Sequence, residues 1–137
     1  MSMIVKKHII TNVYKKYAVI ITYENGKLLL VKHKERETWE IPGGHHETGE
    51  TLIETAKREL FEETGATDFD IKHLFDYSVE QEDHIDYGGV FEANIKVRNK
   101  NLNYEISKVK IFDELPPINE MTHGDIQTKL FNYFKGI

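Results

Sequence analysis

The residues with the clearest chemical potential are acidic side chains within one short segment, namely Glu50, Glu54, Glu59, Glu62 and Glu63. Like charges three or four positions apart on a helix destabilise it by about 0.2–0.5 kcal/mol per pair. A cation nearby would offset this cost. Because Mg²⁺ and Mn²⁺ prefer carboxylate, carbonyl and water oxygens, the segment predicts a site for a divalent cation.

A single helix is expected to carry these carboxylates. Thr51, with Glu54 three residues later, has the pattern of a capping box, so Thr51 is predicted to be the N-cap. Gly65 stands where a left-handed residue would end the helix. The apolar side is predicted to consist of Leu52, Ile53, Ala56, Leu60 and Phe61.

The opposite side of this helix is expected to be anionic. Glu59 and Glu63 lie one turn apart with Glu62 beside them, so their carboxylates should emerge along one stripe. Arg58 is expected to form pairs at i,i+4 spacing with both Glu54 and Glu62.

The rest of the chain reads as strands followed by a second helix. Strands are predicted over residues 4–10 (an edge strand), 17–23, 27–33, 39–41, 70–79, 84–97 and 108–112, with a helix over 124–134. Asn25-Gly26 predicts a tight hairpin turn, because both residues accept positive φ. Pro42 should end the short strand, and Gly88-Gly89 suggests a bulge or a close backbone approach. This order predicts an α/β (α+β) fold.

Composition narrows the class of protein. The 137 residues suit one domain, 1–137, with its own core, and the absence of cysteine excludes disulfides and thiolate chemistry. The net charge of −5 argues against nucleic-acid binding, except at a 5′-phosphorylated end, and against membrane binding. No signal peptide or membrane-spanning run is evident, so a cytoplasmic protein is expected.

The pattern Gly44-x5-Glu50-x7-Arg58-Glu59-Leu60-x-Glu62-Glu63-x-Gly65-Ala66 resembles the Nudix box, residues 44–66 here. The last position, Ala66, is usually a larger aliphatic residue. The preceding Trp39-Glu40-Ile41-Pro42-Gly43 and the later Phe112-Asp113-Glu114-Leu115-Pro116 also resemble the family. The resemblance implies an α/β/α sandwich with a mixed sheet. It also implies metal-dependent hydrolysis of a nucleoside diphosphate linked to another group.

The resemblance also implies roles for individual residues. Glu59 and Glu63 match the main ligands of Mg²⁺ or Mn²⁺, Glu62 a third ligand or water-orienting group, and Gly43 a carbonyl ligand. Arg58, with Glu50, would orient the carboxylates. The catalytic set is thus predicted to be Glu59, Glu62 and Arg58. The general base is Glu59 or a carboxylate on a distant loop, for which the candidates are Glu80, Glu82, Asp83 and Glu105. Glu105 is preferred among these, because it lies just before the last strand, where some relatives carry an extra metal ligand; it is therefore also a predicted ligand here.

The Nudix box does not indicate which residues contact the substrate, so these are predicted from residue type and position. Trp39, Arg36 and Tyr87 are the predicted substrate contacts, although Trp39 equally suits a half-buried strand aromatic. Core positions are the plainer interpretation of Tyr77, Tyr87 and Phe91. A solvated loop is the plainer interpretation of Lys32, His33, Lys34 and Arg36, and of His45 and His46.

Among family activities, a MutT-like (d)NTP or oxidised-nucleotide (8-oxo-dGTP-type) pyrophosphohydrolase fits best. Glu82 stands where relatives that hydrolyse ADP-ribose often carry proline. The alternatives are another nucleotide derivative (a nucleotide sugar, a dinucleoside polyphosphate or a 5′-triphosphate RNA) and a non-catalytic nucleotide-binding module. The expected partner is a small nucleotide, and the protein is expected to be a monomer or homodimer.

Overall fold

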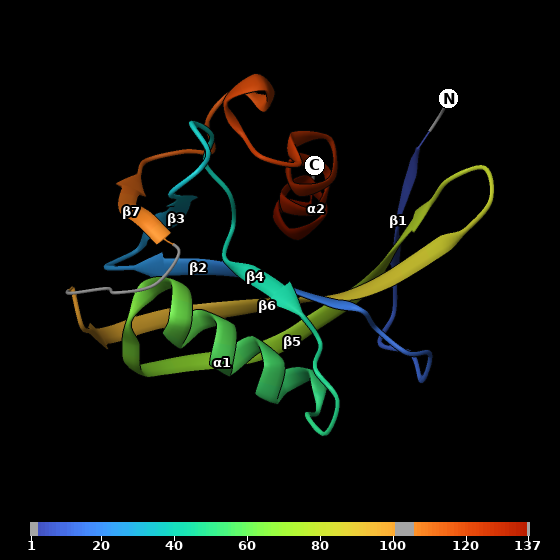
Figure 1. Ribbon diagram of the computed structural model, residues 1–137, viewed down its shortest axis with the longest axis horizontal. Helices are drawn as coiled ribbons and strands as arrows, with labels where there is room; N and C mark the ends of the chain where they lie inside the picture. The colour runs from blue at the N-terminus through green and yellow to red at the C-terminus, as the bar shows by residue number, and fades with distance from the viewer. Residues whose placement is uncertain (1–2, 101–105, 137) are drawn as a thin grey trace.

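A computed structural model of the chain describes residues 3–100 and 106–136 (Figure 1). The elements, in order, are β1 (Ile4–His8), β2 (Tyr17–Glu24), β3 (Lys27–His33), β4 (Gly43–His45), α1 (Leu52–Thr64), β5 (Ala66–Glu80), β6 (Ile85–Arg98), β7 (Ile106–Phe112), the 3₁₀ turn η1 (Ile118–Glu120) and α2 (Gly124–Lys135). Among the described helices, none is long and apolar enough to cross a membrane.

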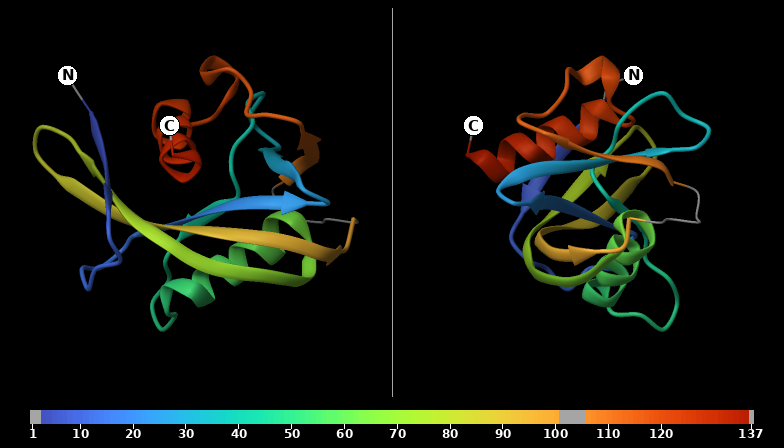
Figure 2. Two further views of the ribbon diagram at one scale, coloured as in Figure 1. Left: turned by 180° about the vertical axis from the view of Figure 1, so that it is seen from behind. Right: turned by 90° about the vertical axis from the view of Figure 1, so that its left-hand side faces the viewer.

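The strands form one twisted sheet with a helix on each face (Figure 2). The order is β1-β5-β6-β2-β3-β7, with β4 paired to β2. The sheet is mixed because β2 and β6 run parallel while the other paired strands run antiparallel. The predicted α/β/α sandwich with a mixed sheet is confirmed.

Each face of the sheet has its own core. Leu60 and Ala56 of α1 pack with Phe91 and Ile20, all fully buried. On the other face, Leu130 of α2 packs in a second buried cluster. Burial of an aliphatic or aromatic side chain stabilises a fold by about 1.5–3 kcal/mol. The sheet is therefore fixed from both sides.

Two local predictions about strands are confirmed. Asn25 and Gly26 have φ values of 53° and 77°, and they join β2 to β3 in the predicted hairpin. β1 lies at one edge of the sheet, where it pairs with β5 alone among the described strands.

Helix α1 begins and ends as predicted. The Thr51 side chain accepts from the Glu54 N–H, the Glu54 carboxylate accepts from the Thr51 N–H at 2.8 Å, and Gly65 has φ 79°. Two expectations about its sides were wrong. Glu54 lies in the capping box and is absent from the ion pairs of Arg58, and Phe61 is 44% exposed because it lies at the edge of the apolar face.

The segment before α1 differs from the prediction. Residues 39–41 form isolated bridges, Val31 with Glu40 and Trp39 with Met121, rather than a strand. The strand comes after Pro42, since β4 pairs with Tyr17–Val19 of β2. Pro42 lacks an N–H, but its carbonyl accepts from Ile20, so pairing with β2 begins there.

Other differences concern β5, β6 and the turn that follows. β5 begins at Ala66, directly after the helix, rather than near residue 70. Gly88-Gly89 is a place of close approach without a bulge, because the register shifts of this pair lie within residues 66–75 of β5. Glu105 lies outside the described residues.

Candidate active site

Glu63 connects α1 to β4. Its side chain is buried, one oxygen (Oε1) accepts from the Gly43 N–H at 2.9 Å, and the other (Oε2) lies 3.2 Å from His33 Nε2. Both oxygens are therefore held in place. The position of Gly43 is set in turn by its pairing with Val19 of β2.

Glu59 lies one turn earlier, against Gly44. A Cβ atom at Gly44 would meet Glu59 Oε2 at 1.8 Å and Cδ at 2.3 Å, so only glycine leaves room for this carboxylate. Burial, followed by the charge of Glu63, raises the pKa of Glu59 to about 7. A divalent cation beside these two groups would reverse that shift, because it favours the ionised carboxylates.

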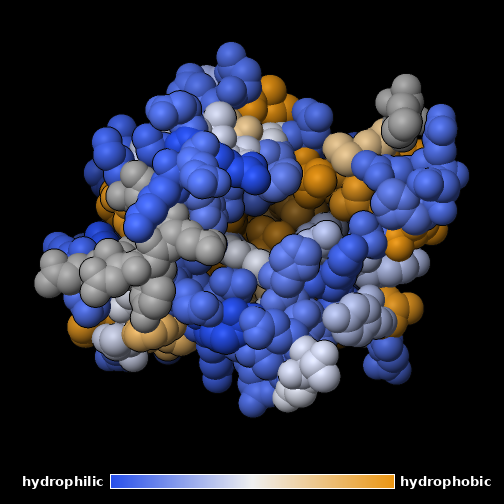
Figure 3. Space-filling model, in the orientation of Figure 1, coloured by the Kyte–Doolittle hydropathy of each residue, from blue (hydrophilic) through white to orange (hydrophobic). Residues whose placement is uncertain are grey.

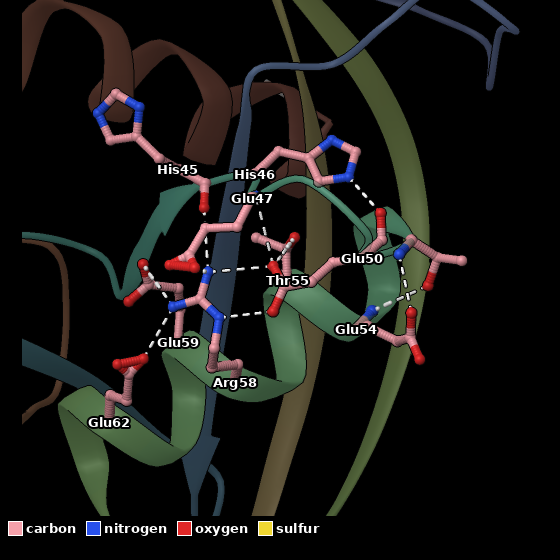
Figure 4. A network of polar contacts seen from close by, with 10 residues as sticks. His45, His46, Glu47, Glu50, Glu54, Thr55, Arg58, Glu59 and Glu62 are labelled. Carbon is pink, nitrogen blue, oxygen red and sulfur yellow. Dashed lines mark hydrogen bonds and ion pairs between the residues drawn. The ribbon is translucent and has the colours of Figure 1, made fainter.

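Arg58 holds the other carboxylates of the segment (Figure 4). Its Nε donates to Glu50 at 2.6 Å, its Nη1 to Glu62 at 2.8 Å, and its Nη2 to the His45 carbonyl at 3.1 Å. The bond from Arg58, aided by one from Thr55 Oγ1 at 2.7 Å, lowers the pKa of Glu50 to about 2. One guanidinium thus orients two acidic side chains and the end of β4.

A second cluster was not predicted from the sequence. His33 Nε2 lies 3.0 Å from Glu40 Oε1 and 3.2 Å from Glu63 Oε2. The hydrogen bond to Glu63 raises the pKa of His33 to about 9, so this imidazole is protonated at neutral pH in the metal-free protein. The sequence holds one signal for Glu40. In an extended segment successive side chains point to opposite sides, so Glu40 should point away from the side that Trp39 faces.

The donors in this region suit a hard divalent cation. Glu59 and Glu63 emerge from one helix, and ligand atoms of His33, Glu40 and Glu63 lie within 4.8 Å of one another. Burial is the largest cause of the raised pKa of Glu59, and the charge of Glu63 adds to it, while the charge of Arg58 acts in the opposite direction. The predicted ligands among the described residues are thus at one place, on α1 and at the start of β4.

The predicted substrate contacts lie apart from one another. Trp39 is half-buried and packs edge-on against Phe112, with ring centroids 5.2 Å apart. Arg36 is exposed on the loop after β3, and Tyr87 lies in β6 near His8, on the α1 side of the sheet. Tyr77 and Phe91 are buried in the core, in line with their plainer interpretation.

The distant carboxylates lie around the β5–β6 turn. Glu80 ends β5 and pairs with Lys6 at 2.8 Å, while Glu82 and Asp83 are exposed in the turn. This turn is at the other end of the sheet from β3 and β7 (Figures 1 and 2). Their predicted role as general base stays a prediction.

The fold and this arrangement of carboxylates define a Nudix protein, and the chain belongs to that family. The profile of the NUDIX domain matches residues 15–126. Nudix enzymes generally use a divalent metal, in agreement with the acidic groups gathered here.

Individual relatives support the same assignment. The chain is 35% identical over 102 residues to YtkD of Bacillus subtilis, named provisionally as an 8-oxo-dGTP diphosphatase; the match covers 74% of this chain and 64% of YtkD. The structure of a variant of the B. subtilis pyrophosphohydrolase BsRppH is similar, with a TM-score of 0.71 and 30% identity over 82% of this chain and 73% of that one. A UDP-X diphosphatase shares the fold, with a TM-score of 0.68 at 22% identity, over 92% of this chain and 66% of that one.

Proposed function

We propose that the protein is a Mg²⁺- or Mn²⁺-dependent hydrolase of the pyrophosphate linkage in a nucleotide. The substrate we favour is a (d)NTP or an oxidised nucleotide of the 8-oxo-dGTP type. The observation that carries the proposal is the complete set of Glu59, Glu62 and Glu63, held by Arg58, Gly43 and Gly44. The name of YtkD supports the choice of substrate. We also propose that residues 1–137 act as one Nudix domain.

Each side chain has a role that follows from its surroundings. Glu59 and Glu63 would hold the cation, with the Gly43 carbonyl and Glu62 as further ligands. A bound divalent cation screens the phosphate oxygens and acidifies or orients water. Arg58 keeps Glu50 and Glu62 in place, because its fork reaches both.

The proton of the attacking water needs an acceptor. Glu59 is one candidate for this role, because the base of some Nudix hydrolases is the glutamate that follows the arginine of the box, here Arg58. Glu62 is more exposed than Glu59 and Glu63, with 38% of its side chain accessible, and it can reach a water molecule on the open side of α1. We assign the base to one of these two carboxylates.

A non-catalytic nucleotide-binding module is the alternative of a different class. Loss of a box carboxylate would favour it, and all of them are present. Nucleotide sugars, dinucleoside polyphosphates and 5′-triphosphate RNA are alternative substrates of the enzyme.

The test is a metal-supplemented panel of these nucleotides, with phosphate and pyrophosphate release measured for each. Turnover of a (d)NTP or an oxidised (d)NTP with Mg²⁺ or Mn²⁺, and none with EDTA, supports the proposal. Turnover of another nucleotide class alone would reassign the substrate. Absence of turnover across the whole panel would favour the binding module.

A further inference from the structure

A row of side chains crosses the sheet on the face that α2 covers. The register pairs Lys7 with Tyr77, Tyr77 with Gly88, Gly88 with Tyr17, and Tyr17 with His45. Directly paired residues point to the same side of a sheet. The row therefore places two tyrosines and a histidine side by side, with a glycine between the tyrosines.

This row adjoins the carboxylate site through β4. Gly43 and Gly44 contact Glu63 and Glu59, and His45, the next residue of the same strand, packs edge-on against Tyr17 at 4.7 Å. Two residues of strand span roughly 7 Å, which is the scale of a diphosphate. A nucleotide whose phosphates lie at α1 thus has its base within reach of the row.

The surface beside this row is hollowed. The space-filling view shows a recess near the middle of the molecule with hydrophobic residues at its floor, and in the matching ribbon view this place lies above β4, between α2 and β1 (Figures 1 and 3). Gly88 contributes to the shape, because a Cβ there would meet the Tyr77 ring at 2.4 Å. The Tyr77 ring therefore lies flat over β6, and Tyr17 stands beside it.

Asp86 is a carboxylate that faces this side of the sheet outside the metal site. Asp86 pairs with Val79 of β5, whose side chain packs with the α2-side core. Within residues 3–100 and 106–136 its carboxylate has no hydrogen bond, and its ion pairs with Lys16 and His84 are long, at 3.7 Å each. Its side chain is 31% exposed. The oxygens are thus available to a ligand.

Asp86 also lies close to the tyrosines. Burial, followed by the nearby Tyr17 and Asp86, raises the pKa of Tyr77. Lys16 connects Asp86 to Tyr17 directly, because its Nζ lies 3.7 Å from the Asp86 carboxylate and 5.5 Å from the Tyr17 ring centre. An aromatic surface and a carboxylate without a hydrogen bond among the described residues therefore lie together at the start of β2.

We propose that Asp86 determines base specificity by accepting the two adjacent N–H donors of a guanine, while Tyr17 stacks against the base. This inference rests on the proposed function for the placement of the phosphates. Guanine and 8-oxoguanine present an imino N1–H beside an amino group, which matches two carboxylate oxygens. Adenine and cytosine present an acceptor next to their amino group, and that acceptor would face the carboxylate unfavourably.

Binding of nucleoside monophosphates without metal tests the inference apart from catalysis. We expect GMP to bind the wild-type protein roughly 10- to 100-fold more tightly than AMP in calorimetry, which is the range for one bidentate base contact. IMP, which keeps N1–H and lacks the amino group, should lie between them. Equal affinities for GMP, IMP and AMP would overturn the proposal whether or not the protein hydrolyses nucleotides.

Variants separate the two residues. Asp86→Asn, nearly isosteric, should remove most of the preference for GMP over AMP, while Tyr17→Leu should weaken GMP and AMP by a similar factor of about 10 or more. Asp113→Asn is the control, because it removes the same charge from a side chain that is 86% exposed and lies after β7, away from Asp86. A preference that survives Asp86→Asn, or that Asp113→Asn removes equally, would contradict the assignment. Unchanged circular dichroism establishes that each variant is folded.

Discussion

The contact between Gly44 and Glu59 gives a sharp prediction, because one methyl group should disturb both stability and metal binding. In Gly44→Ala the new Cβ would lie 1.8, 2.3 and 2.9 Å from Oε2, Cδ and Cγ of Glu59. The φ value of Gly44 is not positive, so backbone strain adds nothing to this collision. The atoms met belong to the end of a flexible side chain that can turn aside, so the cost should lie near the lower end of the roughly 1–3 kcal/mol of overpacking. The melting temperature should fall by roughly 3–6 °C.

The same collision should displace the Glu59 carboxylate by more than an ångström. We therefore expect Mn²⁺ affinity, measured by electron paramagnetic resonance, to fall at least tenfold, and turnover to fall on the order of 100-fold. Urea denaturation of the metal-free protein measures the loss in unfolding free energy separately from the loss of metal affinity.

A double-mutant cycle isolates the cause. Glu59→Ala removes all three of the atoms that the new Cβ would meet. In that background Gly44→Ala should cost less than about 0.5 kcal/mol. If Gly44→Ala is equally destabilising with and without Glu59, or if it leaves Mn²⁺ affinity unchanged, the described packing of Glu59 against β4 is refuted.

The remaining predictions concern α1 and its charges. Thr51→Ala should lower the free energy of unfolding by about 0.5–2 kcal/mol through loss of the N-cap, while kcat stays within twofold of wild type; a fall in kcat at full folding would contradict a purely capping role. Arg58→Lys should lower kcat roughly 10- to 100-fold, because a lysine cannot hold Glu50 and Glu62 together, and a rate within twofold of wild type would remove Arg58 from the site. The pKa of Glu59 is about 7 in the folded, metal-free protein, against an ordinary value of 4.5 in the unfolded chain. Between these two pH values the folded state therefore binds more protons than the unfolded state. The free energy of unfolding should fall as pH rises from 4.5 to 7. Mn²⁺ must displace that proton, so its affinity should drop by up to about tenfold per pH unit below 7, and a flat affinity between pH 5 and 7 would contradict the shift.

Local signals in the sequence were sufficient where a few neighbouring residues decide the structure. Thr51 and Glu54 cap α1 through bonds within four residues, and Asn25-Gly26 turns the chain because both residues accept positive φ. The same capping box explains one wrong expectation. Glu54 satisfies the helix N-terminus, so Arg58 is left to pair with Glu50, which lies before the helix and outside the i,i+4 rule.

The remaining features depend on pairing between distant segments. His33 and Glu40 meet because Glu40 bridges Val31, and they meet Glu63 because β4 carries the chain from β3 to α1. Strand pairing of this kind is set by the whole sheet and has no fixed spacing in the sequence. The row that joins Tyr17 to Gly88 depends on a parallel pairing of β2 with β6, which is equally invisible to local patterns.

The central claim is that the carboxylates of α1 hold a divalent cation for hydrolysis of a nucleotide. Glu63→Gln tests it most directly, because the substitution keeps the shape and the acceptor for the Gly43 N–H while it removes the charge. The decisive measurement is the Mg²⁺-dependent turnover rate of wild type and Glu63→Gln, side by side on the best nucleotide of the panel. We predict that the variant melts within a few degrees of wild type and is slower by roughly 100-fold or more. A folded variant that turns over at the wild-type rate would contradict the claim, because it would show that the charge of Glu63 is not needed for hydrolysis.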